Sequence, residues 1–306
     1  MIEYYKKINS REEMRKLESF SKDCWIRVLD PNQEEIDFLV SKFNLEKDLV
    51  LDGLDIYEAP RIEEENGKAY IYLNLPTKEI ENEYTGSFLI ILSREIFITI
   101  SKFDIGLLEK AGFQKRSFLT SQRTRNLLQI LLFLSNKYSF NIRNILKEVK
   151  KDRRNIRNLN DKDILDLILQ EDILNDYLSS FSPLIHMHAM ILKLKSLKFK
   201  ENEKEFIEDL IVDLNQTLNA CNSALRTITN MRDYYTTTLS NNLNKILKIL
   251  TLFTVFLTIP MVIGGVYGMN INLPGQNLSF IFWVLIGIVM LIWIIAFSLF
   301  KKIKIL

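Results

Sequence analysis

The chain has 306 residues and a formal net charge of +2, with 25% of its residues charged and 47% hydrophobic. This balance gives no indication of a nucleic-acid-binding protein, which would carry a marked excess of Lys and Arg. Its two cysteines, Cys24 and Cys221, show no CxxC or metal-ligand spacing, so we expect a reducing cytoplasmic environment around them. The N-terminal segment lacks an apolar core, and we expect no signal peptide.

The N-terminal part, residues 1–116, has the pattern of a cytoplasmic α/β domain. Short segments rich in Ile, Phe and Tyr are separated by polar turns, which favours neighbouring antiparallel strands with a helical cover. Asp30 and Pro31 supply an N-cap and a first-turn proline, so we expect a helix from there to residue 43. The predicted strands are 24–29, 68–75, 87–92 and 95–100.

Residues 117–203 carry apolar side chains at helical spacing and predict antiparallel cytoplasmic helices. The first run covers 119–149 and is followed by a polar tip. The second covers 164–197 and contains Pro183, which predicts a kink or a break. A reversal is expected over 198–202.

A third helical run begins near residue 204 and contains no Gly or Pro as far as residue 259. At about 1.5 Å per residue, a continuous helix of this length would exceed about 80 Å. We therefore expect one unbroken helix over 204–267 that leads from a cytoplasmic stalk into a membrane.

The C-terminal part is free of Asp, Glu, Lys and Arg from residue 249 to residue 300. This run divides into two apolar segments, 249–267 and 280–300, each close to the ~20 residues that a helix needs to cross a bilayer. The link over 268–279 contains the turn formers Pro274 and Gly275. The pattern predicts a transmembrane hairpin.

Lysines flank this hairpin on one side only. Lys245 and Lys248 precede the first span, Lys301, Lys302 and Lys304 follow the second, and the link carries no charge. Because cytoplasmic loops hold the excess of Lys and Arg in membrane proteins, we expect both termini in the cytoplasm, the link outside, and a basic tail over 301–306.

The first apolar segment carries a stripe of residues at intervals of three or four, which places them on one helical face. This face is polar or small along much of its length. In a membrane such a stripe indicates either an oligomer interface or a helix that turns this face towards a pore. Pro260 removes one helical hydrogen bond, which is tolerated where a neighbouring helix or a water-filled lumen satisfies the freed carbonyl. The stripe consists of Asn244, Leu247, Thr251, Thr254, Thr258, Met261 and Gly265.

The sequence Tyr267-Gly268-Met269-Asn270 at the end of the first span, followed by a short loop and a second span that ends in Lys301-Lys302, resembles the CorA family of magnesium transporters. The upstream residues agree with this resemblance, from Arg232-Asp233 and Tyr234-Tyr235 through Asn244-Lys245 and Lys248 to Pro260 and Gly265. Trp25 and the stretch over 52–67 also resemble the cytoplasmic domain of that family.

Two departures accompany the resemblance. Ser101 stands where many members have a histidine, and the link contains only Asn272, Gln276 and Asn277 where better-known members carry acidic residues. An uncharged link concentrates cations less strongly at the mouth of a pore.

The resemblance implies a funnel-shaped homopentamer: an α+β cytoplasmic domain, long stalk helices and a C-terminal two-helix transmembrane hairpin. Gly268, Met269 and Asn270 would form the entrance that selects the ion, with a ring of Asn270 carboxamides that accepts hydrogen bonds from the waters of hydrated Mg²⁺. We expect Gly268 to let the backbone turn so that its carbonyl joins the ring. The alternative for Asn270 is a left-handed helix C-cap.

The resemblance also places a hydrophobic gate at Leu247 and Leu250, although packing between helices is an equally simple role for both. Asn244 and Asp233 would add polar rings below the gate. For Asp233, an ion pair with Arg232 or Arg226 of a neighbouring helix is the alternative.

A regulatory site for cytoplasmic Mg²⁺ is expected at a subunit interface, by resemblance. Asp209 falls at the matching position of the stalk helix, and Asp213 lies one turn further on. The partner carboxylate would come from the α/β domain, where Asp48, Asp52 and Asp55 are the candidates. Acidic residues on a helix are otherwise simply solvated.

The leading hypothesis is thus a channel-like Mg²⁺ transporter of the plasma membrane, with Mg²⁺ as both cargo and regulator, no organic cofactor, and the lipid bilayer and further copies of the chain as partners. The alternatives are the same architecture moving Co²⁺, Ni²⁺ or Zn²⁺, or a membrane scaffold with a silent pore. An enzyme is not expected, because the sequence has no phosphate-binding loop and no cluster of catalytic residues. His186 and His188 are two residues apart on a helix and do not share a face.

Overall fold

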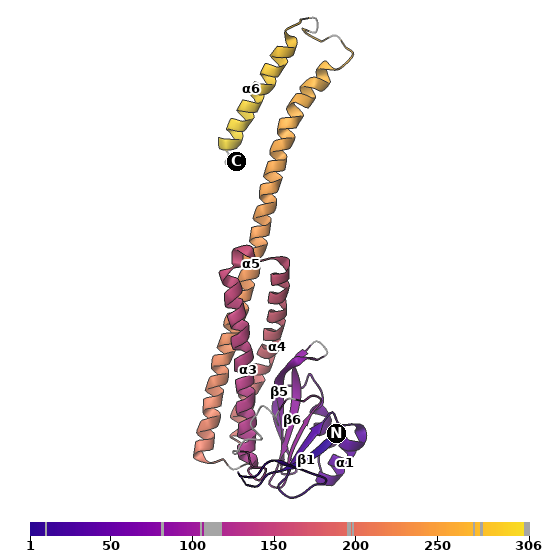
Figure 1. Ribbon diagram of the computed structural model, residues 1–306, viewed down its shortest axis with the longest axis vertical. Helices are drawn as coiled ribbons and strands as arrows, with labels where there is room; N and C mark the ends of the chain where they lie inside the picture. The colour runs from indigo at the N-terminus through magenta and orange to yellow at the C-terminus, as the bar shows by residue number, and fades with distance from the viewer. Residues whose placement is uncertain are drawn as a thin grey trace. The chain divides into compact units, whose positions relative to one another are not determined.

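The computed structural model describes residues 1–9, 11–80, 83–104, 106, 118–194, 197, 199–271, 273–275 and 278–302. The chain forms two compact units, Met1–Met231 and Arg232–Leu306. The boundary between them falls inside one long helix, α5 (Glu201–Tyr267). Figure 1 shows the elements of both units.

The first unit contains a seven-stranded sheet in the order β2-β1-β3-β7-β6-β5-β4. Its neighbours are antiparallel except for β3 and β7, which pair in parallel, so the expectation of antiparallel neighbours was wrong at this pair. The strands are β1 (Ile2–Lys6), β2 (Arg15–Leu17), β3 (Trp25–Leu29), β4 (Arg61–Glu65), β5 (Lys68–Ile80), β6 (Glu83–Leu92) and β7 (Phe97–Ser101).

Three of these strands, β1, β2 and β4, were not predicted. The edge strands β2 and β4 have the sequences RKL and RIEEE, whose charged side chains hide the apolar alternation of a strand. Charges on edge strands protect the open hydrogen-bonding groups of a sheet from pairing with another chain.

One face of the sheet is covered by two short helices, α1 (Gln33–Phe43) and α2 (Lys47–Asp52). Asn32, not Asp30, is the N-cap of α1: its side chain accepts from the backbone N–H of Glu35, and the Glu35 carboxylate accepts from the backbone N–H of Asn32. This capping box satisfies two donors at the helix start, so α1 begins later than predicted.

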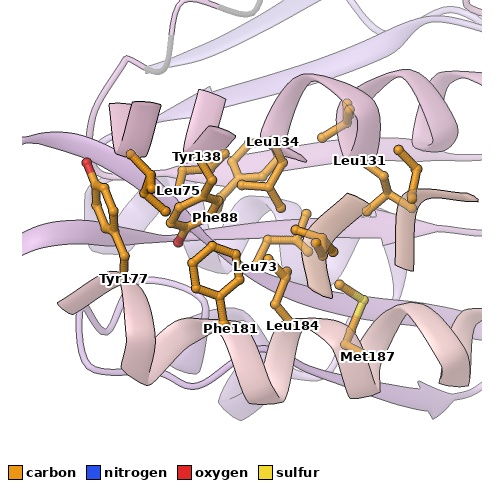
Figure 2. Packing of buried hydrophobic residues seen from close by; sticks show 14 of the residues in the cluster. Leu73, Leu75, Phe88, Leu131, Leu134, Tyr138, Tyr177, Phe181, Leu184 and Met187 are labelled. Carbon is orange, nitrogen blue, oxygen red and sulfur yellow. The ribbon is translucent and has the colours of Figure 1, made fainter. Parts of the chain in front are cut away.

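The other face packs against α3 (Arg123–Arg154) and α4 (Asp161–Ile191), which are separated by a short 3₁₀ turn, η1 (Ile156–Asn158). Alternate residues of the strands point to this face, where Leu73 and Phe88 meet Tyr138 and Phe181 (Figure 2). The Tyr138 hydroxyl donates to the carbonyl of Asn74 at 3.0 Å and ties α3 to the sheet.

The helix α4 runs through Pro183 without a break and ends at Ile191, before the residue expected from the sequence. The part of α5 in the first unit packs on α3 and α4: the Ser139 and Thr217 hydroxyls lie 2.8 Å apart, and Cys221 Sγ donates to the carbonyl of Leu174. The buried residues of α5 follow a helical stripe: Ile207, Leu210, Leu214, Thr217, Cys221, Ala224, Ile228 and Met231.

The second unit holds the remainder of α5 and the final helix, α6 (Ile281–Lys302). Beyond Met231 no described residue of α5 is buried, although its sequence becomes strongly apolar. Among the described residues, two helices are long and apolar enough to cross a membrane: α5 and the segment Ile281–Ser298 of α6. The predicted fold class is confirmed: an α+β domain, long helices and a C-terminal helical hairpin.

Candidate functional site

The Gly268-Met269-Asn270 motif directly follows the last residue of α5. The Gly268 N–H donates to the carbonyl of Gly264 at 2.9 Å, and the Met269 N–H donates to the carbonyl of Val266 at 3.2 Å. These bonds close the helix end, so the side chains of Met269 and Asn270 are exposed beyond it. The motif forms the first turn of the link between the two apolar helices.

The backbone at Asn270 and Gly268 does not lie in the left-handed region. Asn270 is not in the left-handed conformation that a C-cap asparagine adopts, because it is absent from the residues with positive φ. Gly268 has no positive φ either. A Cβ at Gly268 would lie 3.1 Å from the carbonyl oxygen of Gly264, so small size rather than backbone freedom favours glycine here.

The link is held near its start by a side chain of α5. The Tyr267 hydroxyl donates to the carbonyl of Pro274 at 3.3 Å. Gly275 has φ of +81°, a conformation that favours glycine. Some residues of the link and tail lie outside the described residues, namely Asn272, Gln276, Asn277 and Lys304.

The predicted stripe is exposed along its whole length in the single chain. The Leu247 and Met261 side chains are 57% and 73% exposed, and a Cβ added at Gly265 would have no atom within 4 Å. Leu250, beside the stripe, is 60% exposed. Because this face makes no buried contact within the described chain, it is available either to other copies or to a water-filled lumen.

The three threonines of the stripe share one geometry. The hydroxyls of Thr251, Thr254 and Thr258 donate to the carbonyls four residues earlier, at 2.8, 2.9 and 2.7 Å. The hydroxyl proton is thereby used within the helix, and the oxygen lone pairs remain free to accept. Such a row of acceptors suits the outward-pointing protons of a hydrated cation.

The proline of the first span is compensated by the second span. Pro260 lies within α5 and has no N–H to donate to the Phe256 carbonyl. Trp293 Nε1 of α6 donates to that carbonyl at 2.9 Å, and the Phe256 and Trp293 rings stack edge to face at 5.7 Å. The role of Trp293 was missed in the sequence, where a tryptophan in the span opposite a proline was the available signal.

The predicted regulatory residues form no metal-binding cluster within the described part of one chain. Asp209 and Asp213 are exposed on α5, and in the described part of the chain no group of three or more His, Cys, Asp or Glu side chains is arranged to hold a metal ion. Asp233 is also exposed and lies just past the boundary of the first unit.

Among the three candidate partners, Asp52 is already paired. Its carboxylate lies 2.7 Å from the Arg61 guanidinium, which also contacts Glu58 and Glu63. Asp55 accepts from the backbone N–H of Tyr57 at 3.0 Å, and Asp48 is exposed on α2. Asp48 and Asp55 are therefore the two exposed candidates that form no ion pair in the described residues.

The two histidines do not form a site together. His186 is exposed, whereas His188 is fully buried and its Nδ1 donates to the Leu184 carbonyl at 2.8 Å. Burial lowers the pKa of His188 to about 4, against the smaller opposing effect of that hydrogen bond. His188 is thus a neutral side chain of the helical core at neutral pH.

The family model for the CorA-like Mg²⁺ transporter protein matches residues 21–302 of the chain. The chain belongs to this family. The CorA-like match reaches into both units, from the strand β3 to the end of α6, and includes the long helix α5 and the hairpin with its GMN turn.

CorA proteins from two organisms are similar over almost the whole chain. The cobalt/magnesium transport protein CorA of Methanocaldococcus jannaschii is 27% identical over 288 residues, which cover 91% of this chain and 90% of that protein. The magnesium transport protein CorA of Campylobacter jejuni is 26% identical over 300 residues, with the same two shares.

A solved CorA structure shows the same fold. The complete structure of the CorA magnesium transporter from Methanocaldococcus jannaschii superposes with a TM-score of 0.82 at 23% identity, covering 99% of this chain and 98% of that one. Membership in the CorA-like family makes the protein a membrane transporter rather than an enzyme, and its two long apolar helices fit that role.

Proposed function

We propose that the protein is a channel-like transporter through which Mg²⁺ enters the cell down its electrochemical gradient. The observation that carries the proposal is the exposed acceptor-lined face of α5, which leads to the GMN turn in a chain of the CorA-like family. Several copies of α5, five by resemblance, would turn this face inward and enclose a pore.

Asn270 selects the ion at the outer mouth in this proposal. One carboxamide from each copy presents a neutral oxygen to the water shell of Mg²⁺, which the ion releases reluctantly. A neutral ring holds a divalent cation less tightly than an Asp ring would, and weaker binding permits faster release into the pore. Gly268 and Met269 shape the turn that carries the ring.

The pore below this ring is lined by oxygen acceptors. The Thr251, Thr254 and Thr258 oxygens have their protons directed to the backbone, so a hydrated cation meets acceptors at each of these levels. Met261 and Gly265 line the stretch between these threonines and the GMN turn.

Leu247 and Leu250 form the gate in this proposal. A ring of exposed leucines excludes water when the helices are close together, and a small separation of the helices rewets it. Asn244 and Asp233 then provide polar rings through which the hydrated ion leaves on the cytoplasmic side.

Cytoplasmic Mg²⁺ closes the channel through Asp209 and Asp213. Because the described part of a single chain offers no cluster that could hold a metal, the ligands come from two copies, with Asp48 or Asp55 as the partner carboxylate. Loss of the ion leaves carboxylates facing each other, and their repulsion loosens the closed state.

The protein lies in the plasma membrane, with both termini cytoplasmic and the 268–279 link outside. The lysines on either side of the hairpin support this orientation. The proposed order of parts is the α/β domain over 1–116, helices over 117–203, stalk and first span over 204–267, and second span over 280–300.

Flux into proteoliposomes that hold a Mg²⁺-sensitive dye tests the proposal. The native protein is expected to carry Mg²⁺ under an inward-negative potential, and cobalt hexaammine, a mimic of the hydrated ion, is expected to block it. Asn270→Ala should abolish the flux. Asn242→Ala provides the matched control. Asn242 is exposed on α5 about 160° around the helix from Asn244 of the stripe, and so faces away from the proposed pore.

Absence of native flux at low internal Mg²⁺ would overturn the Mg²⁺ proposal. The same assay with Co²⁺ then tests the second candidate cargo, which the name of the Methanocaldococcus jannaschii relative favours. Full activity in Asn270→Ala would instead show that Asn270 does not select the ion.

A further inference from the structure

A groove of about 650 Å³ lies between α5 and α6 in the C-terminal unit. Its α5 wall consists of Asn241, Lys245, Lys248 and Leu252 and, on the side of the stripe, of Asn244, Leu247 and Thr251; its α6 wall is Phe300. Phe300 is seven residues from Trp293 and so shares the helix face that the Trp293–Phe256 contact turns towards α5. The groove therefore follows from the same packing that joins the two spans.

The groove has a marked excess of positive charge. Lys245 and Lys248 are exposed at its edge, and in the described residues neither forms an ion pair with a carboxylate. From Arg232 to the C-terminus the sequence holds six Lys or Arg residues and a single acidic side chain, Asp233. The lysines of the groove thus lack a counter-charge within their own unit.

A neighbouring copy does not supply that counter-charge from the same unit. Copies related by rotation about a pore axis place equivalent residues at the same height. Asp233 lies twelve residues before Lys245, which corresponds to about 18 Å along a helix. That separation is too large for an ion pair, so Asp233 does not neutralise the lysines of the groove.

On the side away from the stripe, the groove changes from polar to apolar along α5. Asn241, Lys245, Lys248 and Leu252 follow one another at intervals of four, three and four and so share one face. The two lysines are the last charges before the charge-free run that begins at residue 249, and Leu252 and Phe300 lie within that run. A ligand that fits has an anionic head and an apolar chain joined end to end.

We propose that this groove binds an anionic phospholipid of the cytoplasmic leaflet. The phosphate lies between Lys245 and Lys248 with Asn241 as an additional donor, and an acyl chain runs past Leu252 and Phe300. Basic pockets between membrane helices on the cytoplasmic side have the charge and position to hold phospholipid head groups. The proposal rests on the membrane hairpin and its orientation and does not depend on which ion is carried.

Native mass spectrometry of the full-length protein, titrated with phosphatidylglycerol or phosphatidylcholine, tests this site. Phosphatidylglycerol is expected to bind at least tenfold more tightly than phosphatidylcholine. Lys245→Gln with Lys248→Gln should weaken phosphatidylglycerol binding about tenfold or more, as each lysine near a membrane surface contributes appreciably to binding anionic lipid. Replacing both lysines with Arg should retain the affinity.

The matched control is Lys147→Gln with Lys150→Gln, which removes two exposed charges from α3 in the other unit. Phe300→Ala tests the apolar wall and should weaken phospholipid binding several-fold. Size-exclusion chromatography of each variant verifies that assembly is retained. Equal affinity in the Gln double variant and the native protein would overturn the proposal, as would equal affinity for the two lipids.

Glycerol phosphate is the soluble comparison. If it displaces phosphatidylglycerol at similar concentrations, the groove is a free phosphate site and the lipid assignment is wrong. Because lipid binding is read without transport, its failure leaves the flux result unaffected, and a protein that binds lipid but carries no Mg²⁺ would contradict only the proposed function.

Discussion

Trp293 donates from its indole Nε1 to the carbonyl oxygen of Phe256 at 2.9 Å. That carbonyl is the one that Pro260 leaves without a helical donor. In a bilayer, where water cannot replace a missing donor, a partner from a neighbouring helix is the means by which a proline is tolerated. Trp293 of the second span therefore supplies the hydrogen-bond donor that Pro260 lacks. The same bond fixes the rotation of α6 relative to α5.

The first prediction concerns this bond. Trp293→Phe keeps an aromatic ring but removes the donor, and we expect a loss of about 1–2 kcal/mol in the free energy of unfolding. Unfolding in mixed detergent micelles, followed by circular dichroism, measures it. Trp283→Phe is the matched control, because the Trp283 side chain is 71% exposed.

A second substitution tests whether the lost hydrogen bond causes the loss of stability in Trp293→Phe. Pro260→Ala returns an N–H to α5, so the Phe256 carbonyl regains its helical donor. Trp293→Phe should then cost clearly less in the Pro260→Ala background than in the native protein. An equal cost in both backgrounds would show that the Trp293 ring, and not its hydrogen bond, stabilises the hairpin.

The second prediction concerns the gate. Leu247→Asn places an amide in a ring that closes by excluding water, so the closed pore should become wet. We expect Mg²⁺ flux several-fold above that of the native protein when internal Mg²⁺ is high enough to close the native channel. Dye-loaded proteoliposomes measure this flux.

Ile246→Asn is the control for the gate, because Ile246 is similarly exposed but lies about 100° around α5 from Leu247. Equal flux in the two variants would show that Leu247 packs between helices and does not gate the pore.

The third prediction concerns regulation. Mg²⁺ bound between copies should protect the native protein from limited proteolysis, and Asp209→Asn should raise the Mg²⁺ concentration for half-protection several-fold because the amide binds the ion more weakly. Glu208→Gln is the control, because it removes a neighbouring exposed carboxylate from a different face of α5. Identical protection curves for Asp209→Asn and the native protein would exclude Asp209 as a ligand.

The fourth prediction concerns pH. His188 has a pKa of about 4 in the folded protein, against an unfolded value of 6.5. The unfolded state therefore binds the proton first as the pH falls. The stability contributed by neutral His188 is fully present above pH 6.5 and decreases between pH 6.5 and about 4, by about 3 kcal/mol in total.

His188→Leu should remove this part of the pH dependence, while His186→Gln, at an exposed position, should leave it in place. Urea unfolding of the full-length protein at several pH values, followed by circular dichroism, measures the difference. An unchanged pH dependence in His188→Leu would assign the acid sensitivity to other groups.

Much of this architecture follows from local sequence patterns. The charge-free run over 249–300 and the absence of helix breakers before Pro260 predict the hairpin and the long helix. Whether a segment can span a bilayer, and how long a helix it forms, follow from its own composition and length. The stripe on α5 could be predicted from helical spacing, because it is read along one helix without knowledge of its neighbours. The role of the GMN motif was predicted from the resemblance to the CorA family.

Other features depend on contacts between residues far apart in the sequence. The parallel pairing of β3 with β7, the charged edge strands β2 and β4, and the unbroken passage of α4 through Pro183 arise from packing that local propensity does not encode. The same holds for the indole of Trp293 at the Phe256 carbonyl and for the groove beside Lys245 and Lys248. Each required the tertiary structure, because a donor, a strand or a groove wall finds its partner only when the chain has folded.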